Sequence, residues 1–138
     1  MLKKLIDTNL FIDRFSNPSL YRHVFLSEGL VYLSSVVLME LRAGAHSEKA
    51  LKAVNDLFDF FRRVDRIIVP SISNYERAGE IISRLQMVKG YEIKKSASIT
   101  NDCLIAASAK SIGAFICTQN KKDFQAIKDV FDCKVIFV

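Results

Sequence analysis

Three acidic residues, Asp7, Glu40 and Asp102, occupy positions where a charge is unexpected. Asp7 directly follows an apolar pair at the end of a short strand-like segment. Glu40 and Asp102 interrupt the apolar stripes of two helical segments, so each is expected to face inward. A carboxylate removed from water without a partner costs several kcal/mol, even after its surroundings relax. Each of these acids therefore requires a cation or a set of good hydrogen bonds.

Two interpretations of Asp7 are open from its position alone. An aspartate behind a strand is a favoured helix N-cap, and it is also well placed for ligand binding at the carboxyl edge of a parallel sheet. Glu40 and Asp102 favour the second interpretation, because one inward acid is usually a satisfied core acid or the partner of an arginine, whereas two together with a strand-end aspartate are harder to explain in that way. If the three converge, each pair about 4 Å apart repels by about 4 kcal/mol at an effective dielectric of about 20. A bound cation would make that arrangement tolerable.

The donors of this set are all oxygens, which suits Mg²⁺ or Mn²⁺ better than zinc. His23 and His46 lie outside HExxH and outside any Cys/His spacing of a zinc site. The five glycines form neither of the common phosphate-binding loops, which excludes P-loop and dinucleotide-binding enzymes. Asn9 stands where a phosphatase of the haloacid dehalogenase type needs a second aspartate. A serine or cysteine nucleophile would lack a histidine at a recognisable spacing.

The elements that must position these acids alternate between strands and helices. Short segments rich in β-favouring residues predict strands at 3–7, 30–34, 66–70, 114–118 and 133–138. Apolar periodicity and capping residues predict helices at 8–15, 18–26, 34–45, 46–63, 73–88, 99–111 and 123–128. This alternation indicates an α/β fold of three layers, with a central parallel sheet of about five strands between helices. We expect residues 1–138 to form a single domain.

Composition fits such a domain, since 138 residues with 50% hydrophobic and 25% charged side chains can bury a real core. The longest weakly polar run, 29–39, is shorter than the roughly 20 residues that cross a bilayer. The apolar stretch at 5–6 is too short for a secretory signal. We therefore expect a cytoplasmic protein without a membrane span. Its cysteines are expected to be reduced core thiols: Cys103, Cys117 and Cys133.

The formal net charge of +5 favours an anionic partner without naming one. If three carboxylates gather in one pocket, the remaining surface is more basic still. An acidic pocket inside a basic rim suits a metal-assisted reaction on a polyanion.

Four stretches of the chain resemble the signature segments of the PIN domain. They are LIDTNLFID, SSVVLMELRAGA, NDCLIAASAKSIGAFICT and TQNKKDF, in the family's order and over nearly the whole length. The most similar group is the VapC-like toxins of toxin–antitoxin pairs. The resemblance implies a PIN-like fold and an endoribonuclease that uses Mg²⁺ or Mn²⁺ to hydrolyse RNA, leaving 5′-phosphate and 3′-hydroxyl ends. Carried over by position, its three acids are Asp7, Glu40 and Asp102.

The resemblance also assigns roles. Asp7 and Asp102 would bind the ion directly, while Glu40 would bind through water or help to deprotonate the nucleophile. The fourth acidic position falls on Asn120, which carries no charge, with Asp123 three residues further on. We count Asn120 with the catalytic residues and favour Asp123 as a helix-starting acid. Thr8, Asn9 and Thr118 resemble the polar residues that support the acids in this family. Their alternative role is to stabilise turns and cap helices.

Basic residues and an apolar helix face supply candidate contacts for partners. Four basic residues are candidates for contacts with the RNA backbone, with a solvated face as the favoured alternative for any single one: Arg14, Arg42, Lys121 and Lys122. The resemblance implies a homodimer and a small antitoxin whose helical tail occupies a groove beside the site. The apolar face of 50–61 suits either interface, or the core.

Two alternatives to a toxin ribonuclease are open. One is a PIN nuclease of RNA processing outside any toxin pair. The other is a non-catalytic PIN-like module that binds RNA or a partner, which the uncharged Asn120 would suit. The presence of Asp7, Glu40 and Asp102 together argues against the second, because a binding module gains little from three crowded charges.

Overall fold

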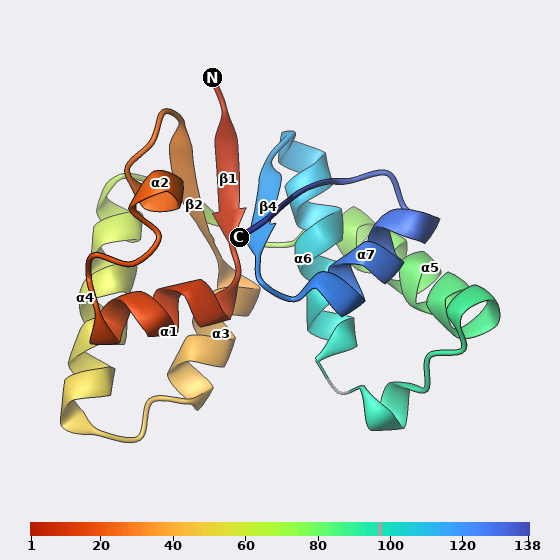
Figure 1. Ribbon diagram of the computed structural model, residues 1–138, viewed down its shortest axis with the longest axis horizontal. Helices are drawn as coiled ribbons and strands as arrows, with labels where there is room; N and C mark the ends of the chain where they lie inside the picture. The colour runs from red at the N-terminus through yellow and green to blue at the C-terminus, as the bar shows by residue number, and fades with distance from the viewer. Residues whose placement is uncertain (97) are drawn as a thin grey trace.

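The computed structural model describes residues 1–96 and 98–138 and has a central parallel sheet with helices on both sides (Figure 1). In these residues five strands pair in the order β3-β2-β1-β4-β5. They are β1 (Lys3–Ile6), β2 (Leu30–Ser34), β3 (Ile67–Ile68), β4 (Phe115–Thr118) and β5 (Lys134–Phe137). The predicted α/β class and the five-stranded parallel sheet are therefore confirmed.

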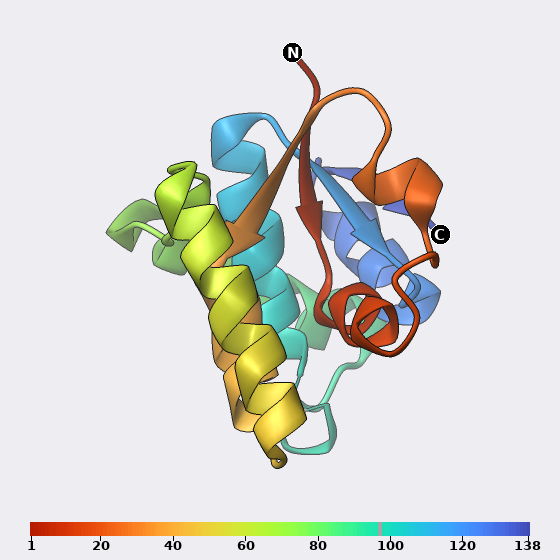
Figure 2. The same ribbon diagram turned by 90° about the vertical axis from the view of Figure 1, so that its left-hand side faces the viewer.

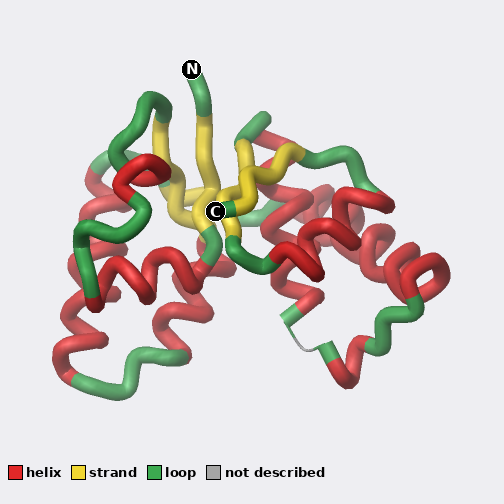
Figure 3. The backbone as a smooth tube through the Cα atoms, in the orientation of Figure 1, coloured by secondary structure: helices red, strands yellow, loops and turns green. Residues whose placement is uncertain are grey.

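The helices lie on both faces of this sheet. They are α1 (Thr8–Ser16), α2 (Arg22–Phe25), α3 (Ser35–Ala43), α4 (Glu48–Arg63), α5 (Ile72–Lys89), α6 (Ile99–Ile112) and α7 (Lys121–Val130), with a 3₁₀ turn at Ile93–Lys95. Seen from the side of the molecule on which α4 and β2 lie, α1 and α2 are on one side of the strands and α4 is on the other (Figure 2). The tube view shows the strands gathered between the two groups of helices (Figure 3).

Several predicted boundaries were wrong, each for a local reason. The helix expected at 18–26 begins only at Arg22, because Tyr21 takes a left-handed backbone with φ of 55°. The strand expected at 66–70 is reduced to Ile67–Ile68, since Pro70 cannot donate to a strand ladder. The helix expected from 123 starts two residues earlier, where Asn120 caps it.

The register of the sheet places the site. Strand β1 is central and pairs with β2 on one side and β4 on the other, all parallel. Because parallel strands end at the same edge, the residues that follow β1 and β4 meet there. Asp7 follows β1, and Thr118 is the last residue of β4.

The core contains the three cysteines as buried free thiols, as predicted. It also contains a lysine that the sequence pattern did not single out. Lys4 in β1 is buried, and its ammonium donates to the carbonyl of Val24 and to Oγ of Ser27. These bonds tie the central strand to the segment around α2. Within the part of the chain that the structure describes, no helix is long and apolar enough to cross a membrane.

Candidate active site

Asp7 caps α1 and also faces the neighbouring strand. Its Oδ1 accepts a hydrogen bond of 2.9 Å from the backbone N–H of Thr8. Its Oδ2 accepts a bond of 2.7 Å from the hydroxyl of Thr118, at the end of β4. The carboxylate is only 8% exposed. The capping contact exists, yet the second oxygen is turned toward the end of β4, so capping alone does not describe this residue.

Glu40 reaches the same edge from α3. It is half-buried rather than fully inward, and its Oε1 accepts a bond of 2.8 Å from the hydroxyl of Thr8. Thr8 therefore contacts two acids, one through its backbone N–H and one through its side chain. This links the acid behind β1 to the acid on α3.

Asp102 is the most deeply placed of the three acids. It lies in the first turn of α6 and is 5% exposed. Among the described residues its Oδ2 is buried without a hydrogen-bond partner. Burial, followed by the charges of Asp7, Glu40 and Asp123, raises the pKa of its carboxyl to about 8. Buried polar atoms almost always have partners, so this oxygen is the atom of the site best suited to accept a contact from a ligand.

Asn120 and Asp123 form a reciprocal pair at the start of α7. The side-chain amide of Asn120 donates a hydrogen bond of 3.0 Å to Oδ2 of Asp123. Its oxygen accepts a bond of 3.3 Å from the backbone N–H of Asp123. The backbone N–H of Asn120 donates to the hydroxyl of Thr118 at 3.0 Å. Thr118 thus joins Asp7 to the fourth predicted position. Asp123 does start a helix, and its charge also acts on Asp102.

Sequence analysis missed Tyr91, which holds the other oxygen of Asp123. Its hydroxyl donates to Oδ1 of Asp123 at 2.8 Å. Burial, and then this hydrogen bond, raises the pKa of Tyr91 to about 12. Nothing in the sequence marks this tyrosine, because it lies just beyond the glycine that ends α5, in a segment without periodicity.

A second missed contact braces the loop between β4 and α7. The amide of Gln119 donates to the hydroxyl of Tyr21 at 2.8 Å, and that hydroxyl donates to Oδ2 of Asp13 at 2.6 Å. The left-handed backbone of Tyr21 directs its ring toward this loop only in the folded chain, so no local pattern could have revealed the contact.

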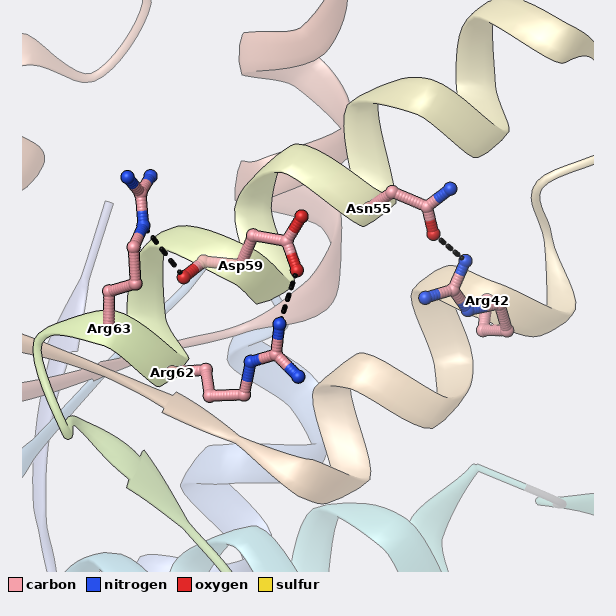
Figure 4. A network of polar contacts seen from close by, with 5 residues as sticks. All are labelled: Arg42, Asn55, Asp59, Arg62 and Arg63. Carbon is pink, nitrogen blue, oxygen red and sulfur yellow. Dashed lines mark hydrogen bonds and ion pairs between the residues drawn. The ribbon is translucent and has the colours of Figure 1, made fainter.

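Two of the candidate phosphate contacts have partners within the protein. Arg14 donates to the carbonyl of Leu20 and stacks on the ring of Phe25, 4.5 Å from its centroid. Arg42 donates to the side chain of Asn55 on α4 (Figure 4). The remaining two candidates, Lys121 and Lys122, are exposed in the first turn of α7 beside Asp123. Asn9 is exposed and takes part in none of the contacts above.

The acids are electrostatically coupled without forming a preassembled cage. Within residues 1–96 and 98–138, no three His, Cys, Asp or Glu side chains stand at ligand geometry. The charges of Asp7, Glu40 and Asp123 nevertheless act on Asp102 strongly enough to raise its pKa. Burial and these neighbouring charges favour the protonated form of Asp102, and a nearby cation would favour the charged form instead.

A parallel sheet with carboxylates and a hydroxyl at the carboxyl ends of its central strands defines a class of α/β protein with an acidic site at the sheet edge. The family model of the PIN domain matches residues 4–130, and the chain belongs to this family.

The chain is similar to other proteins in both sequence and fold. The chain is 31% identical over 130 residues to the tRNA(fMet)-specific endonuclease VapC of Shigella flexneri, covering 92% of this chain and 93% of that one. It is similar to DNA-bound VapBC from Salmonella typhimurium, with a TM-score of 0.75, 26% identity and coverage of 99% and 98% of the two chains. VapBC2 from Rickettsia felis, bound to a fragment of its promoter, gives a TM-score of 0.73 at 26% identity, with 99% of each chain covered.

Proposed function

We propose that this chain, acting as one PIN domain over residues 1–138, is a VapC-like endoribonuclease that hydrolyses RNA phosphodiester bonds. The observation that carries the proposal is the buried, unpartnered Oδ2 of Asp102 among the described residues, electrostatically coupled to three other carboxylates. The similarity to a tRNA-specific endonuclease over nearly the full length supports the reaction class.

The donor set fits Mg²⁺ or Mn²⁺. Asp7, Glu40 and Asp102 offer carboxylate oxygens, the ligands that these hard cations prefer, and Asp102 has an oxygen that needs a partner. We assign these three residues to the cation. When bound, the cation would neutralise charge growing on the phosphate and make a water molecule easier to deprotonate.

The protein's own residues supply orientation and proton transfer. Thr8 holds Oε1 of Glu40 and so orients this carboxylate, which would take a proton from the attacking water. Thr118 fixes Asp7 through its hydroxyl. Asn120 and Tyr91 hold the two oxygens of Asp123, which supplies the negative charge of the fourth position. In this assignment Asn120 is a positioning residue for that acid.

We assign an antitoxin to an apolar cavity of about 370 Å³ on the opposite side of the molecule from α7. Leu57, Phe60 and Phe61, within the predicted 50–61 face, line it together with Phe11 and Phe25 from α1 and α2. A groove of this kind accepts the apolar face of a helix. Two similar structures are VapBC complexes, which supports a protein partner.

A homodimer and a cytoplasmic location complete the proposal. Val69, Ile72 and Tyr75 are exposed where β3 leads into α5, with Ile72 82% exposed, so this apolar surface suits a second copy of the chain. The three free thiols suit a reducing compartment.

A role in RNA processing outside a toxin pair would be favoured if no neighbouring reading frame encoded a DNA-binding antitoxin.

Cleavage of a labelled single-stranded RNA by the purified protein, with Mg²⁺ or Mn²⁺, tests the reaction. We expect EDTA and Asp7→Asn each to abolish cutting, and the products to carry 5′-phosphate ends. Asp56→Asn, which removes an exposed acid of α4, is the matched control and should cut normally. Products with 5′-hydroxyl ends would reveal a contaminating nuclease that uses the 2′-hydroxyl. Equal cutting by Asp7→Asn and the wild type would overturn the proposal in favour of the binding module.

A further inference from the structure

A hollow of about 700 Å³ lies beside the acidic site, between the end of α5 and the outer side of α7. Its lining includes Lys89, Tyr91, Lys121, Lys122, Gln125 and Asp129. A smaller hollow of about 230 Å³ adjoins it and shares Lys89, Tyr91 and Lys122. Together these two hollows are called the lysine groove below.

The lysine groove carries a net positive charge of +2. Its four lysines face two acids, and each acid is already paired: Asp129 with Lys89 at 2.8 Å, and Glu92 with Lys95 at 3.3 Å. Lys121 and Lys122 have no carboxylate partner in the part of the chain that the structure describes. Two neighbouring ammonium groups, exposed and unpaired, are suited to phosphates.

Tyr91 joins the lysine groove to the acids. Its side chain lines both hollows, and its hydroxyl donates to Asp123. The unpaired lysines immediately precede Asp123 in the first turn of α7. A chain of phosphates bound by these two lysines therefore lies within one helical turn of Asp123, whose charge acts on Asp102.

We propose that the lysine groove holds single-stranded RNA next to the bond that is cut, with Lys121 and Lys122 on phosphates and the ring of Tyr91 against a base. This proposal rests on the proposed ribonuclease function and specifies where its substrate lies. An RNA strand fits better than a peptide, because bases stack on aromatic rings and phosphates need cations, whereas the cavity beside α4 is lined mainly by apolar side chains.

Binding of a short fluorescent single-stranded RNA, measured by anisotropy in EDTA so that no cutting occurs, tests the proposal. We expect the double variant Lys121→Ala/Lys122→Ala to bind about tenfold more weakly. The slope of log Kd against log salt should fall by about 1.4, at about 0.7 for each lost phosphate contact. Lys49→Ala/Lys52→Ala, on the exposed surface of α4, is the matched control and should bind like the wild type.

Tyr91 is tested separately, with the ring and the hydroxyl distinguished. Tyr91→Leu should weaken binding about tenfold, within the range for loss of one stacked base. Tyr91→Phe keeps the ring and should bind like the wild type, although it loses the bond to Asp123. Weakening by both variants to the same degree would contradict the stacking role.

The binding and cleavage results separate the two proposals. If the wild type cuts RNA but the double lysine variant keeps its affinity and salt slope, the lysine groove is wrong and the ribonuclease stands. If the lysines control binding but no metal supports cutting, the groove stands and the ribonuclease fails. If the wild type binds no RNA, the groove proposal is overturned.

Discussion

The hydroxyl of Thr118 donates to Oδ2 of Asp7 at 2.7 Å, although 111 residues separate the two in the chain. The hydroxyl oxygen of Thr118 also accepts a hydrogen bond of 3.0 Å from the backbone N–H of Asn120. One fully buried hydroxyl thus fixes the ends of both central strands and the start of α7. The arrangement of the acids depends on it.

We expect Thr118→Val to lower the free energy of unfolding by about 1–3 kcal/mol, because it leaves buried polar groups without a partner. Cleavage should slow about tenfold, since Asp7 loses the bond that orients it. Thr118→Ser keeps the hydroxyl and should retain most of both properties. Urea unfolding and single-turnover cleavage measure the two effects, and a valine variant as active as the serine variant would exclude the orienting role.

The stability of the metal-free protein should depend on pH through Asp102. Its pKa rises from an ordinary 3.8 to about 8, so the folded chain holds the proton more tightly between these values. The stabilisation is complete below about pH 4 and is lost as the pH rises toward 8. We expect the free energy of unfolding in EDTA to fall by about 1 kcal/mol per pH unit over that range. Asp102→Asn should remove this slope, as urea unfolding at several pH values will show.

A divalent cation should reverse that loss above neutral pH. At a concentration a hundredfold above its Kd, it should stabilise the wild type by about 2.7 kcal/mol. Asp102→Asn loses an assigned ligand and should gain far less. Thermal melting with and without Mg²⁺ or Mn²⁺ measures the difference, and an equal gain in both proteins would place the cation elsewhere.

Asp123 should prove necessary for cleavage. We expect Asp123→Asn to slow cutting by at least about tenfold, because the site loses a charge that Asn120 and Tyr91 hold in place. Asp132→Asn removes an exposed aspartate just beyond the same helix, whose pairing with Lys110 contributes little. It should cut at the wild-type rate. If both variants are equally active, Asp123 only starts the helix.

The fold and the three acids could be predicted because each leaves a local trace. An aspartate at a strand end and acids on apolar stripes are charged residues among apolar neighbours, and such positions can be recognised in the sequence. Tyr91 and Lys4 leave no such trace. Tyr91 contacts Asp123 across 32 residues of the chain, with α6 and β4 lying between them in sequence. Lys4 is buried because a carbonyl and a hydroxyl from 20 and 23 residues away converge on its ammonium.

The basic residues could likewise not be told apart from the sequence alone. Arg14, Arg42, Lys121 and Lys122 look alike in the sequence, and only the packing sorts them. Aromatic and amide partners take up the two arginines, while the lysines stay free at the start of α7. Basic composition therefore indicated an anionic partner without showing where it binds.

The central place of β1 has a consequence for synthesis on the ribosome. The first acid is translated within the first seven residues, yet its neighbours in the sheet include β4, which emerges more than a hundred residues later. A nascent chain that stops before Asp102 lacks one acid, and a chain that stops before Thr118 lacks the hydroxyl that orients another. Truncated products of translation that stops before Thr118 are therefore expected to be harmless to the cell's RNA, because the reactive constellation arises only after that residue has been added.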